Sequence, residues 1–406
     1  MTALFWLFTA LTALIVLALL GNTALVARGY GMPVRAVRGD RAAPFEHAAN
    51  GDRLANDERP PISVLVPLKG AAPGLKGRLE RLLAAGTRTD QFVFAMESID
   101  DPAHAVGLAM REEHPGRDVA IAVSGPPGER MGKQHNLAAA ATVAKHALLA
   151  SMDDDVELDA AHLDEGARLA SGPDAGVAFA MPYYLPGASS GGALVAAYTN
   201  YGFSLHMGAL ALRPKPKFIV GGFWVTPRAA MDEVGGFAAF TDTVSDDSAI
   251  GRAMHEVGRV NRPLTTTVGL APERRGLLDG ARHVLKWLTL LRAEGWSVFV
   301  PVALAWHPGW FGVLAAVAGS VAGLPALLTF TPLGIAVLAR IASIASLNGK
   351  AYPSLAPGSY ALATLAYEFV VAPWLFLVAA FRRHVVWRGR RYRIGRGGRI
   401  RDGRGT

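Results

Sequence analysis

The sequence predicts an α/β fold with a doubly wound, mostly parallel sheet, and apolar membrane helices near both ends of the chain. Short apolar runs alternate with helical patterns between residues 62 and 156. Residues 3–26 and 298–339 contain no Asp, Glu, Lys or Arg. Acidic residues follow two of the apolar runs. Open α/β sheets bind ligands at the carboxyl ends of their strands, so these acids mark a candidate site.

Four apolar runs predict strands, and three helical patterns lie between them. The order βαβαβαβ favours parallel strands joined by helical crossovers. No G-x-G-x-x-G motif follows the first run, which argues against a dinucleotide-binding fold. The expected strands cover 62–67, 92–96, 119–123 and 147–150, and the expected helices cover 75–85, 103–113 and 136–146, within a catalytic domain over 61–280.

The first apolar segment, residues 3–26, is long enough to span a bilayer at about 24 residues. A signal peptide has a shorter apolar part preceded by basic residues, so we interpret residues 1–27 as an uncleaved anchor. Arginines follow it in a linker over 28–60, which predicts a cytoplasmic location for the catalytic domain. These arginines are Arg28, Arg35, Arg38 and Arg41. We expect an integral membrane protein of a bacterial inner membrane.

The C-terminal apolar region covers 298–381. Residues 298–339 have the length of two spans joined by a tight turn. Residues 360–381 form a third segment that carries Glu368 and Pro373, and a charge inside a span marks a packed or functional site. Three full spans after a cytoplasmic domain would place the basic tail outside, against the positive-inside rule. We therefore expect the third segment to be re-entrant.

Charge is concentrated in the tail over 382–406. This tail contains ten Arg and one Asp, or +9, while the whole chain carries +8, so the remainder carries −1. A basic tail beside apolar segments predicts binding to anionic lipid headgroups rather than to nucleic acid. The chain has no cysteine, which excludes disulfides and cysteine-based metal sites.

The acid triplet after the fourth expected strand is the strongest candidate site. Alternate strand residues point the same way, so Asp153 and Asp155 could share one divalent cation while Asp154 points elsewhere. Mg²⁺ and Mn²⁺ prefer carboxylate oxygens and often bind together with a diphosphate. The alternative is a solvated acidic turn.

Other stretches have a functional and an ordinary interpretation. The glycines and Lys133 before the helix at Asn136 could hold phosphate oxygens, or could form an ordinary glycine-rich loop. The pair Gly221-Gly222 indicates backbone close to a ligand, or a bulged strand. Asp246 and Asp247 precede a helical pattern and could be catalytic or could cap the helix.

Two helical patterns lack a clear place in the sheet. Residues 282–292 interleave Leu, Trp and cations, which predicts an interfacial helix within 281–297. Residues 198–212 form an apolar pattern without charge until Leu212. This second pattern could be an interfacial entrance for a lipid or a buried core helix.

The order of these motifs resembles the family-2-like glycosyltransferases with the GT-A fold. It is closer to the ceramide glucosyltransferases and the bacterial enzymes that glycosylate hopanoid lipids. The resemblance extends from the first anchor to the tail. It rests on Pro67-Leu68-Lys69-Gly70, Asp100-Asp101-Pro102-Ala103, Lys133-Gln134-His135-Asn136-Leu137, and Trp387-Arg388-Gly389-Arg390-Arg391-Tyr392-Arg393.

The resemblance implies roles for individual residues. Asp153 and Asp155 match the metal-binding pair, and Asp247 matches the general base, with Asp246 in place of the usual Glu. The motif Q/R-x-x-R-W is represented by His283, Lys286 and Trp287, so Lys286 would stabilise the departing diphosphate without the bidentate geometry of Arg. The donor would be bound by Lys69, Glu97, Asp101, Lys133, Asn136, Asp153, His283 and Trp287, and the acceptor by His206, Gly222, Phe223 and Trp224.

The implied reaction is a single inverting transfer that depends on Mn²⁺ or Mg²⁺. The resemblance implies glucose from UDP-glucose as the sugar and ceramide as the acceptor. N-acetylglucosamine, a uronic acid, and a hopanoid or other lipid are alternatives. A processive polysaccharide synthase fits less well because few spans are available to line a polymer channel. The other class is a non-enzymatic membrane binding platform, but the acids at all three sites argue against it.

Overall fold

The computed structural model describes residues 1–30, 59–272 and 274–401. Within these residues the chain forms two compact units. The first unit contains residues 1–32, 183–210 and 272–396, and the second contains 33–182, 211–271 and 397–406. Arg35, Arg38, Arg41 and most of the predicted linker lie outside the described residues. The predicted domain boundaries stay a prediction, although residues 183–210 pack with the first unit.

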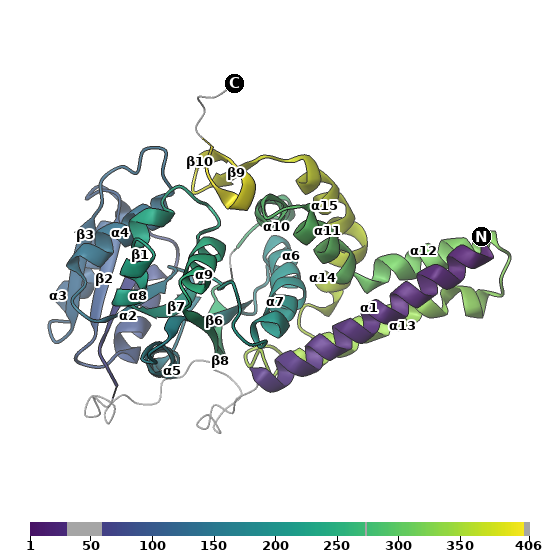
Figure 1. The fold of residues 1–406 in the computed structure, drawn as a ribbon, viewed down its shortest axis with the longest axis horizontal. Coiled ribbons are helices and arrows are strands. Elements are labelled where there is room, and N and C mark those ends of the chain that lie inside the picture. Colours follow the sequence, from purple (N-terminus) through teal and green to yellow (C-terminus); the bar gives the residue numbers. More distant parts are fainter. Residues whose placement is uncertain (31–58, 273, 402–406) are drawn as a thin grey trace. The chain divides into compact units, whose positions relative to one another are not determined.

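The second unit is built on an eight-stranded sheet with the order β3-β2-β1-β4-β7-β6-β8-β5 (Figure 1). The pairs β1–β2, β2–β3 and β1–β4 are parallel, and β7 runs antiparallel to β4. The mostly parallel α/β fold predicted from the sequence is confirmed. The strands are β1 (Ile62–Pro67), β2 (Gln91–Met96), β3 (Asp118–Val123), β4 (Leu148–Met152), β5 (Val156–Glu157), β6 (Ala175–Tyr184), β7 (Phe223–Pro227) and β8 (Val260–Leu270).

Helices cover the sheet of the second unit. Helix α4 packs on β1, β2 and β3, and α5 packs on β7 and β8. The apolar residues of β1 and β2 are almost fully buried beneath these helices. The helices are α2 (Leu75–Ala85), α3 (Pro102–Glu113), α4 (Gly132–Val143), α5 (Ala160–Ala170), α8 (Arg228–Glu233) and α9 (Asp246–Glu256), with a short 3₁₀ turn η3 (Phe237–Phe240).

The strand order creates a topological switch point between β1 and β4. From β1 the chain winds outward to β2 and β3, and then returns to place β4 on the other side of β1. In open α/β sheets, ligands bind at the carboxyl ends of the strands beside such a switch point. Lys69 follows β1 and Asp153 follows β4, so the switch point carries two of the predicted site residues.

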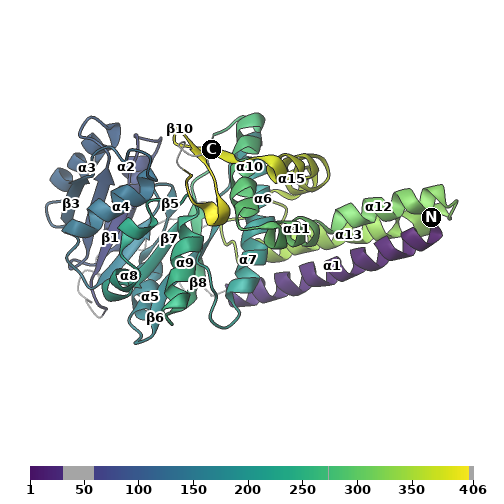
Figure 2. The ribbon, with the colours of Figure 1, turned by 45° about the horizontal axis from the view of Figure 1, so that its top comes forward.

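The first unit is helical. Its helices α1, α12 and α13 lie side by side in both views (Figures 1 and 2). Its elements are α1 (Thr2–Gly29), α6 (Ser190–Tyr198), the π-helix η2 (Thr199–Phe203), α7 (Ser204–Ala211), α10 (Leu277–Ala293), α11 (Trp296–Ala305), α12 (Pro308–Val321), α13 (Ala326–Leu347), α14 (Ala361–Ala366), the π-helix η4 (Tyr367–Val371), α15 (Ala372–Phe381), β9 (His384–Trp387), β10 (Arg390–Arg393) and a 3₁₀ turn η5 (Arg396–Gly398).

Within the described residues, three helical segments are long and apolar enough to cross a membrane: 2–29, 326–347 and 361–381. Helices α11 and α12 pass the same test only as a pair, which is bent by 67°. Two spans were predicted in 298–339. The first corresponds to the bent pair α11 and α12, and the second corresponds to the single helix α13. At 1.5 Å per residue, the 22 residues of α13 extend about 33 Å, close to the thickness of a hydrocarbon core.

Helices α1 and α13 run in the same direction. Phe5, near the start of α1, packs against Ala315 and Ala318 close to the turn that leads into α13. At the other end, Thr23 Oγ1 lies 2.6 Å from Ser343 Oγ. If α1 enters the cytoplasm, α13 does so as well, with α12 running outward between them. A cytoplasmic tail would then require that 361–381 does not cross, although this segment is long and apolar enough to do so, and the re-entrant assignment stays a prediction.

Glu368, whose charge was predicted to mark a packed or functional site, is buried in an ion pair. Glu368 Oε2 accepts a hydrogen bond of 2.8 Å from Nε of Arg340. The other carboxylate oxygen accepts from Gly309 N at 2.8 Å. Arg340 also donates to the carbonyls of Tyr201 and Trp306. The Trp306 carbonyl lies at the bend between α11 and α12, so the ion pair satisfies backbone that the broken helix leaves free.

The apolar segment predicted over 198–212 is a packed helix in the first unit. It continues α6 through η2 into α7, and the side chains of Tyr198, Tyr201 and Leu205 are buried. A Cβ at Gly191 would collide with the backbone of Gly276 at the start of α10, so α6 and α10 pack closely. The core-helix alternative is supported for this segment.

The topology generates a labelling prediction. Because the chain has no cysteine, single cysteines can be introduced without background. We expect Arg393→Cys, near Gly395 in the tail, to be protected from an impermeant thiol reagent in intact cells, and Ala322→Cys, at the turn before α13, to react. External protease should leave residues from Arg28 to about Trp296 uncut. Labelling of the tail cysteine in sealed cells would contradict the re-entrant assignment.

Candidate active site at the carboxyl edge of the sheet

Polar side chains from the loops after β1 and β2 contact one another at the carboxyl edge of the sheet. Lys69 Nζ forms an ion pair of 2.9 Å with Glu97 Oε2. Asp101 Oδ1 accepts hydrogen bonds from Gly70 N at 2.8 Å and from Ala103 N at 2.9 Å. Asp101 therefore caps α3 and fixes the loop after β1 at the same time. The three predicted donor residues Lys69, Glu97 and Asp101 are brought together.

A lysine between two carboxylates forms the centre of the site. Lys133 Nζ lies 2.8 Å from Asp153 Oδ1 and 3.4 Å from Asp246 Oδ2. Gln134 Nε2 donates to the same oxygen of Asp246 at 2.6 Å. Burial lowers the pKa of Lys133, but the surrounding carboxylates outweigh burial and hold its pKa well above the usual range. Lys133 thus carries a fixed positive charge that links α4, the end of β4 and the start of α9.

Asp247 lies beside this cluster, and one of its carboxylate oxygens has no hydrogen-bond partner among the described residues. A Cβ at Gly221 would collide with its carboxylate, and the Gly221 backbone N–H donates to it. Among the described residues, Asp247 Oδ1 is buried and has no hydrogen-bond partner. Burial, followed by the charge of Asp246, raises the pKa of Asp247 to about 8, although Lys133 opposes the rise. Oδ1 is therefore a buried acceptor whose hydrogen bond no described residue supplies.

The acid triplet lies in a turn between β4 and β5 rather than in the extended strand that the prediction assumed. Asp153 and Asp155 keep partly exposed side chains, whereas Asp154 is buried. The backbone of the triplet is fixed by hydrogen bonds from Arg78 Nε to the Asp154 carbonyl at 2.8 Å and from Ala271 N to the Asp155 carbonyl at 2.8 Å. Asp153 N donates to the Gly222 carbonyl at 2.8 Å, which joins the triplet to the glycine pair before β7.

The carboxylates at this edge fit a hard divalent cation. Asp153 and Asp155 offer exposed carboxylate oxygens, and Lys133 shows that the cluster attracts a positive charge. Two protein carboxylates are a common number for Mg²⁺ or Mn²⁺, because the remaining positions are filled by water and phosphate oxygens. The chemistry of these residues suits the predicted metal, and the metal-binding pair stays a prediction.

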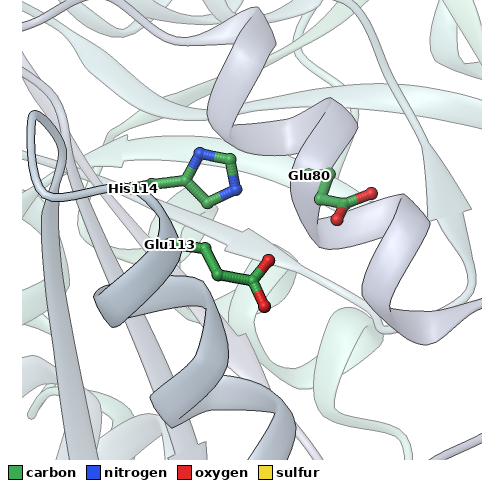
Figure 3. A group of neighbouring side chains, drawn as sticks. All are labelled: Glu80, Glu113 and His114. Atoms are coloured by element: carbon green, nitrogen blue, oxygen red, sulfur yellow. The ribbon is translucent and has the colours of Figure 1, made fainter.

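A second group with metal-ligand spacing lies on the surface of α2 and α3. It consists of Glu80, Glu113 and His114, whose ligand atoms lie within 4.8 Å of one another (Figure 3). Lys76 Nζ is 2.8 Å from Glu113 and 3.9 Å from Glu80, so a lysine already compensates these exposed carboxylates. This group is remote from the carboxyl edge in sequence and has no counterpart among the predicted residues.

Some predicted residues serve the scaffold of the second unit. The Asn136 amide accepts from Ser124 Oγ at 2.7 Å and donates to the carbonyls of Leu68 and Ala95 at 3.3 and 3.4 Å. Phe223 and Trp224 are buried in β7, where Trp224 stacks on Phe237. In this conformation, Asn136 has its hydrogen bonds filled, and the two aromatic rings offer no open surface. Their donor and acceptor roles stay predictions, and only the Gly222 backbone borders the cluster.

The remaining predicted residues belong to the first unit. In α10, His283 packs edge-on against Trp287, and Trp287 stacks on Tyr198. Lys286 Nζ lies 3.8 Å from the ring centroid of Trp387 in β9. Burial and the nearby cations, Lys286 first, lower the pKa of His283 to about 2, so His283 is neutral at pH 7. Its Nε2 is buried without a partner among the described residues.

His206, predicted to contact the acceptor, is packed within the first unit. Its Nδ1 lies 3.0 Å from Asn22 Nδ2 of α1, and its ring stacks on Trp306 at 5.2 Å between centroids. The acceptor role of His206 stays a prediction. Gln134 and Gly221 contact the two acids at the start of α9, although the sequence predicted no individual role for either residue. The glycine pair in the sequence already indicated a close backbone approach at Gly221. The hydrogen bond of Gln134 joins it to Asp246, 112 residues away, and no local sequence pattern predicts such a contact.

Comparison with known proteins gives one family match. The model of glycosyl transferase family 21 matches residues 21–400. A mannosyltransferase, PcManGT from Pyrobaculum calidifontis, solved with GDP-Man and Mn²⁺, is 17% identical with a TM-score of 0.46 and covers 89% of this chain and 99% of its own.

Two other solved structures show similarity over a smaller part of the chain. Glucosyl-3-phosphoglycerate synthase from Mycobacterium tuberculosis, with Mn²⁺, UDP and phosphoglyceric acid, is 14% identical with a TM-score of 0.36 and covers 58% of this chain and 78% of its own. GalNAc-T7, with UDP, GalNAc and Mn²⁺, is 11% identical with a TM-score of 0.41 and covers 59% of this chain and 51% of its own.

The two acidic groups give opposite predictions for metal binding. Asp153→Asn removes one charge from the carboxyl edge, so we expect the affinity for Mn²⁺ in the presence of UDP to fall by about tenfold or more. Glu113→Gln is the matched control on the surface of α3, and it should leave this affinity unchanged. Titration calorimetry, or the loss of the free Mn²⁺ resonance, measures both variants. Equal weakening by the two substitutions would contradict the assignment.

Proposed function

Because this chain belongs to glycosyl transferase family 21, we propose that it transfers a single sugar from a UDP-sugar to a hydroxyl group of a membrane lipid. The observation that carries the proposal is the cluster of Lys133, Asp153 and Asp246 at the switch point, beside the partly unpaired carboxylate of Asp247. The same chain contains three helices long and apolar enough to cross a membrane, which suits an acceptor that never leaves the bilayer.

In the proposed mechanism, the loops after β1, β2 and β4 bind the donor. Lys69, Glu97 and Asp101 would hold the uridine end, since they already form a connected polar edge. Asp153 and Asp155 would hold Mn²⁺ or Mg²⁺. When bound, the ion neutralises the diphosphate leaving group. Lys133 supplies a second fixed positive charge beside Asp153, which would orient a diphosphate and limit repulsion from the acids.

Asp247 is proposed as the general base. The lipid oxygen attacks C1 of the sugar, its proton passes to Asp247, and the bond between C1 and the phosphate oxygen breaks to release UDP. One displacement of this kind inverts the anomeric carbon. Gly221 allows the backbone to approach Asp247 so closely that one oxygen is fixed, while Oδ1 is left to accept the proton. A cation held by Asp153 would lower the pKa of Asp247 and favour its ionised form.

The sequence resemblance assigns further donor-binding roles to residues of α10, and the contacts within the first unit suit these roles. Lys286 carries the charge expected to stabilise departing UDP, and its stacking over Trp387 limits the motion of its side chain. His283 is neutral at pH 7 and has an unused ring nitrogen, so it would give a hydrogen bond rather than a charge. Trp287 holds both residues against α6 through its stacking on Tyr198.

We assign glucose as the sugar and ceramide as the acceptor, as the sequence resemblance implies. Membranes containing the full-length chain, incubated with radiolabelled UDP-glucose, should yield a labelled lipid whose mass is ceramide plus one hexose. Parallel incubations with UDP-N-acetylglucosamine and a UDP-uronic acid, followed by mass spectrometry of the labelled lipid, test the alternative donors and a hopanoid acceptor. If purified protein binds UDP-sugars without any transfer, the chain is a binding platform.

The assignment of Asp247 generates a kinetic prediction. Asp247→Asn keeps the size of the side chain but removes the proton acceptor, so we expect kcat to fall by about 10²- to 10⁴-fold, with UDP binding near normal. Asn caps helices as well as Asp, so a residue that only capped α9 would tolerate this change. Asp118→Asn, at the amino end of β3, is the control and should keep full turnover. Turnover within a few-fold of the parent for Asp247→Asn would leave Asp246 as the candidate base.

A further inference from the structure

The end of the described chain pairs with the segment that leads into the site. Residues 398–400, which we name the C-terminal strap, run antiparallel to residues 242–244 of the second unit. Val244 N donates to the Gly398 carbonyl at 2.9 Å, and Ile400 N donates to the Asp242 carbonyl at 2.7 Å. Thr243 and Arg399 are paired in an antiparallel bridge. The strap thus fixes this segment by backbone hydrogen bonds, which do not depend on the side chains of the tail.

Gly398 has no room for a side chain. Its φ is +75°, and a Cβ would collide with Ser245. Ser245 is the residue immediately before α9, whose first two residues are Asp246 and Asp247. Any larger residue at position 398 must therefore move either the strap or the start of the helix that carries both acids.

The segment 241–245 is also held by a hydrogen bond from the start of α4. Met131 N donates to the Thr241 carbonyl at 2.7 Å. Met131 is the N-cap residue of α4, two residues before Lys133. Residues 241–245 are therefore held between the helix that supplies Lys133 and the C-terminal strap, and they continue directly into Asp246. The strap itself contributes no group to the cluster of charges.

We propose that the C-terminal strap, through Gly398, is a positioning element for the general base. This inference rests on the proposed function of Asp247. A displacement of about 1 Å at a reacting group can reduce turnover about 10²-fold, so backbone contacts that fix the start of α9 have a direct effect on kcat. The Arg-rich end of the chain then has a role in the catalytic unit that its charge alone does not predict. The exposed pair of Arg399 with Asp242 is a minor part of this role.

Two truncations of the full chain test the proposal. A chain ending at Arg396 lacks the strap, whereas a chain ending at Arg401 retains it and is the matched control. We expect the shorter chain to lose about 10- to 100-fold in kcat, with KM for the UDP-sugar and UDP affinity changed by no more than about twofold. The longer chain should match the parent. A synthetic peptide of residues 396–406, added in excess, should restore part of the lost turnover.

A pair of glycine substitutions gives a second test in case the shorter chain does not fold. Gly398→Ala should lower kcat about tenfold or more. Gly389→Ala is its control, because Gly389 also has a positive φ but a Cβ there meets nothing within 4 Å. Equal kcat for Gly398→Ala and the parent, or equal losses in kcat and donor affinity, would overturn the proposal. Absence of transfer by the parent chain would refute the proposed function itself, which separates the two failures.

Discussion

The arrangement of the catalytic unit depends on one buried cation held between carboxylates. Lys133 contacts Asp153 from β4 and Asp246 from α9, and without it three acids would meet at one edge of the sheet with no compensating charge. The lysine therefore fixes the distance between the predicted metal pair and the predicted base. The charged groups of the site are therefore preorganised before a diphosphate and its metal ion bind. Electrostatic catalysis depends on such preorganisation.

The sequence predicted correctly those strands and helices that depend on residues a few positions apart. The apolar run at 62–67 became β1 with the same bounds, and the helical pattern at 75–85 became α2. The number and order of these elements were sufficient to predict a doubly wound sheet. Asp154 is buried and Asp153 and Asp155 are partly exposed, but this difference arises in a turn after β4 and not from the strand alternation used in the prediction.

Contacts between distant residues were beyond the reach of the same reasoning. Phe223 and Trp224 follow a glycine pair that borders the site, but the antiparallel pairing of β7 with β4 and β6 places both rings in the core. The bend between α11 and α12 is stabilised by Arg340, which lies outside residues 298–339. The sequence of 298–339 alone therefore predicted two regular spans. Gly398 lies in an Arg-rich tail, where its contact with Ser245 leaves no local pattern.

Three consecutive stretches in the C-terminal part of the chain contact other elements of the structure. The segment 361–381 is joined to α13 by the ion pair of Glu368 with Arg340, and breaking a buried ion pair of this kind typically costs about 3–5 kcal/mol. The hairpin of β9 and β10 follows, with Trp387 against Lys286, and the strap then pairs with residues 242–244. A basic tail that only bound lipid headgroups would need none of these contacts, so its sequence is constrained by the active site as well as by the membrane.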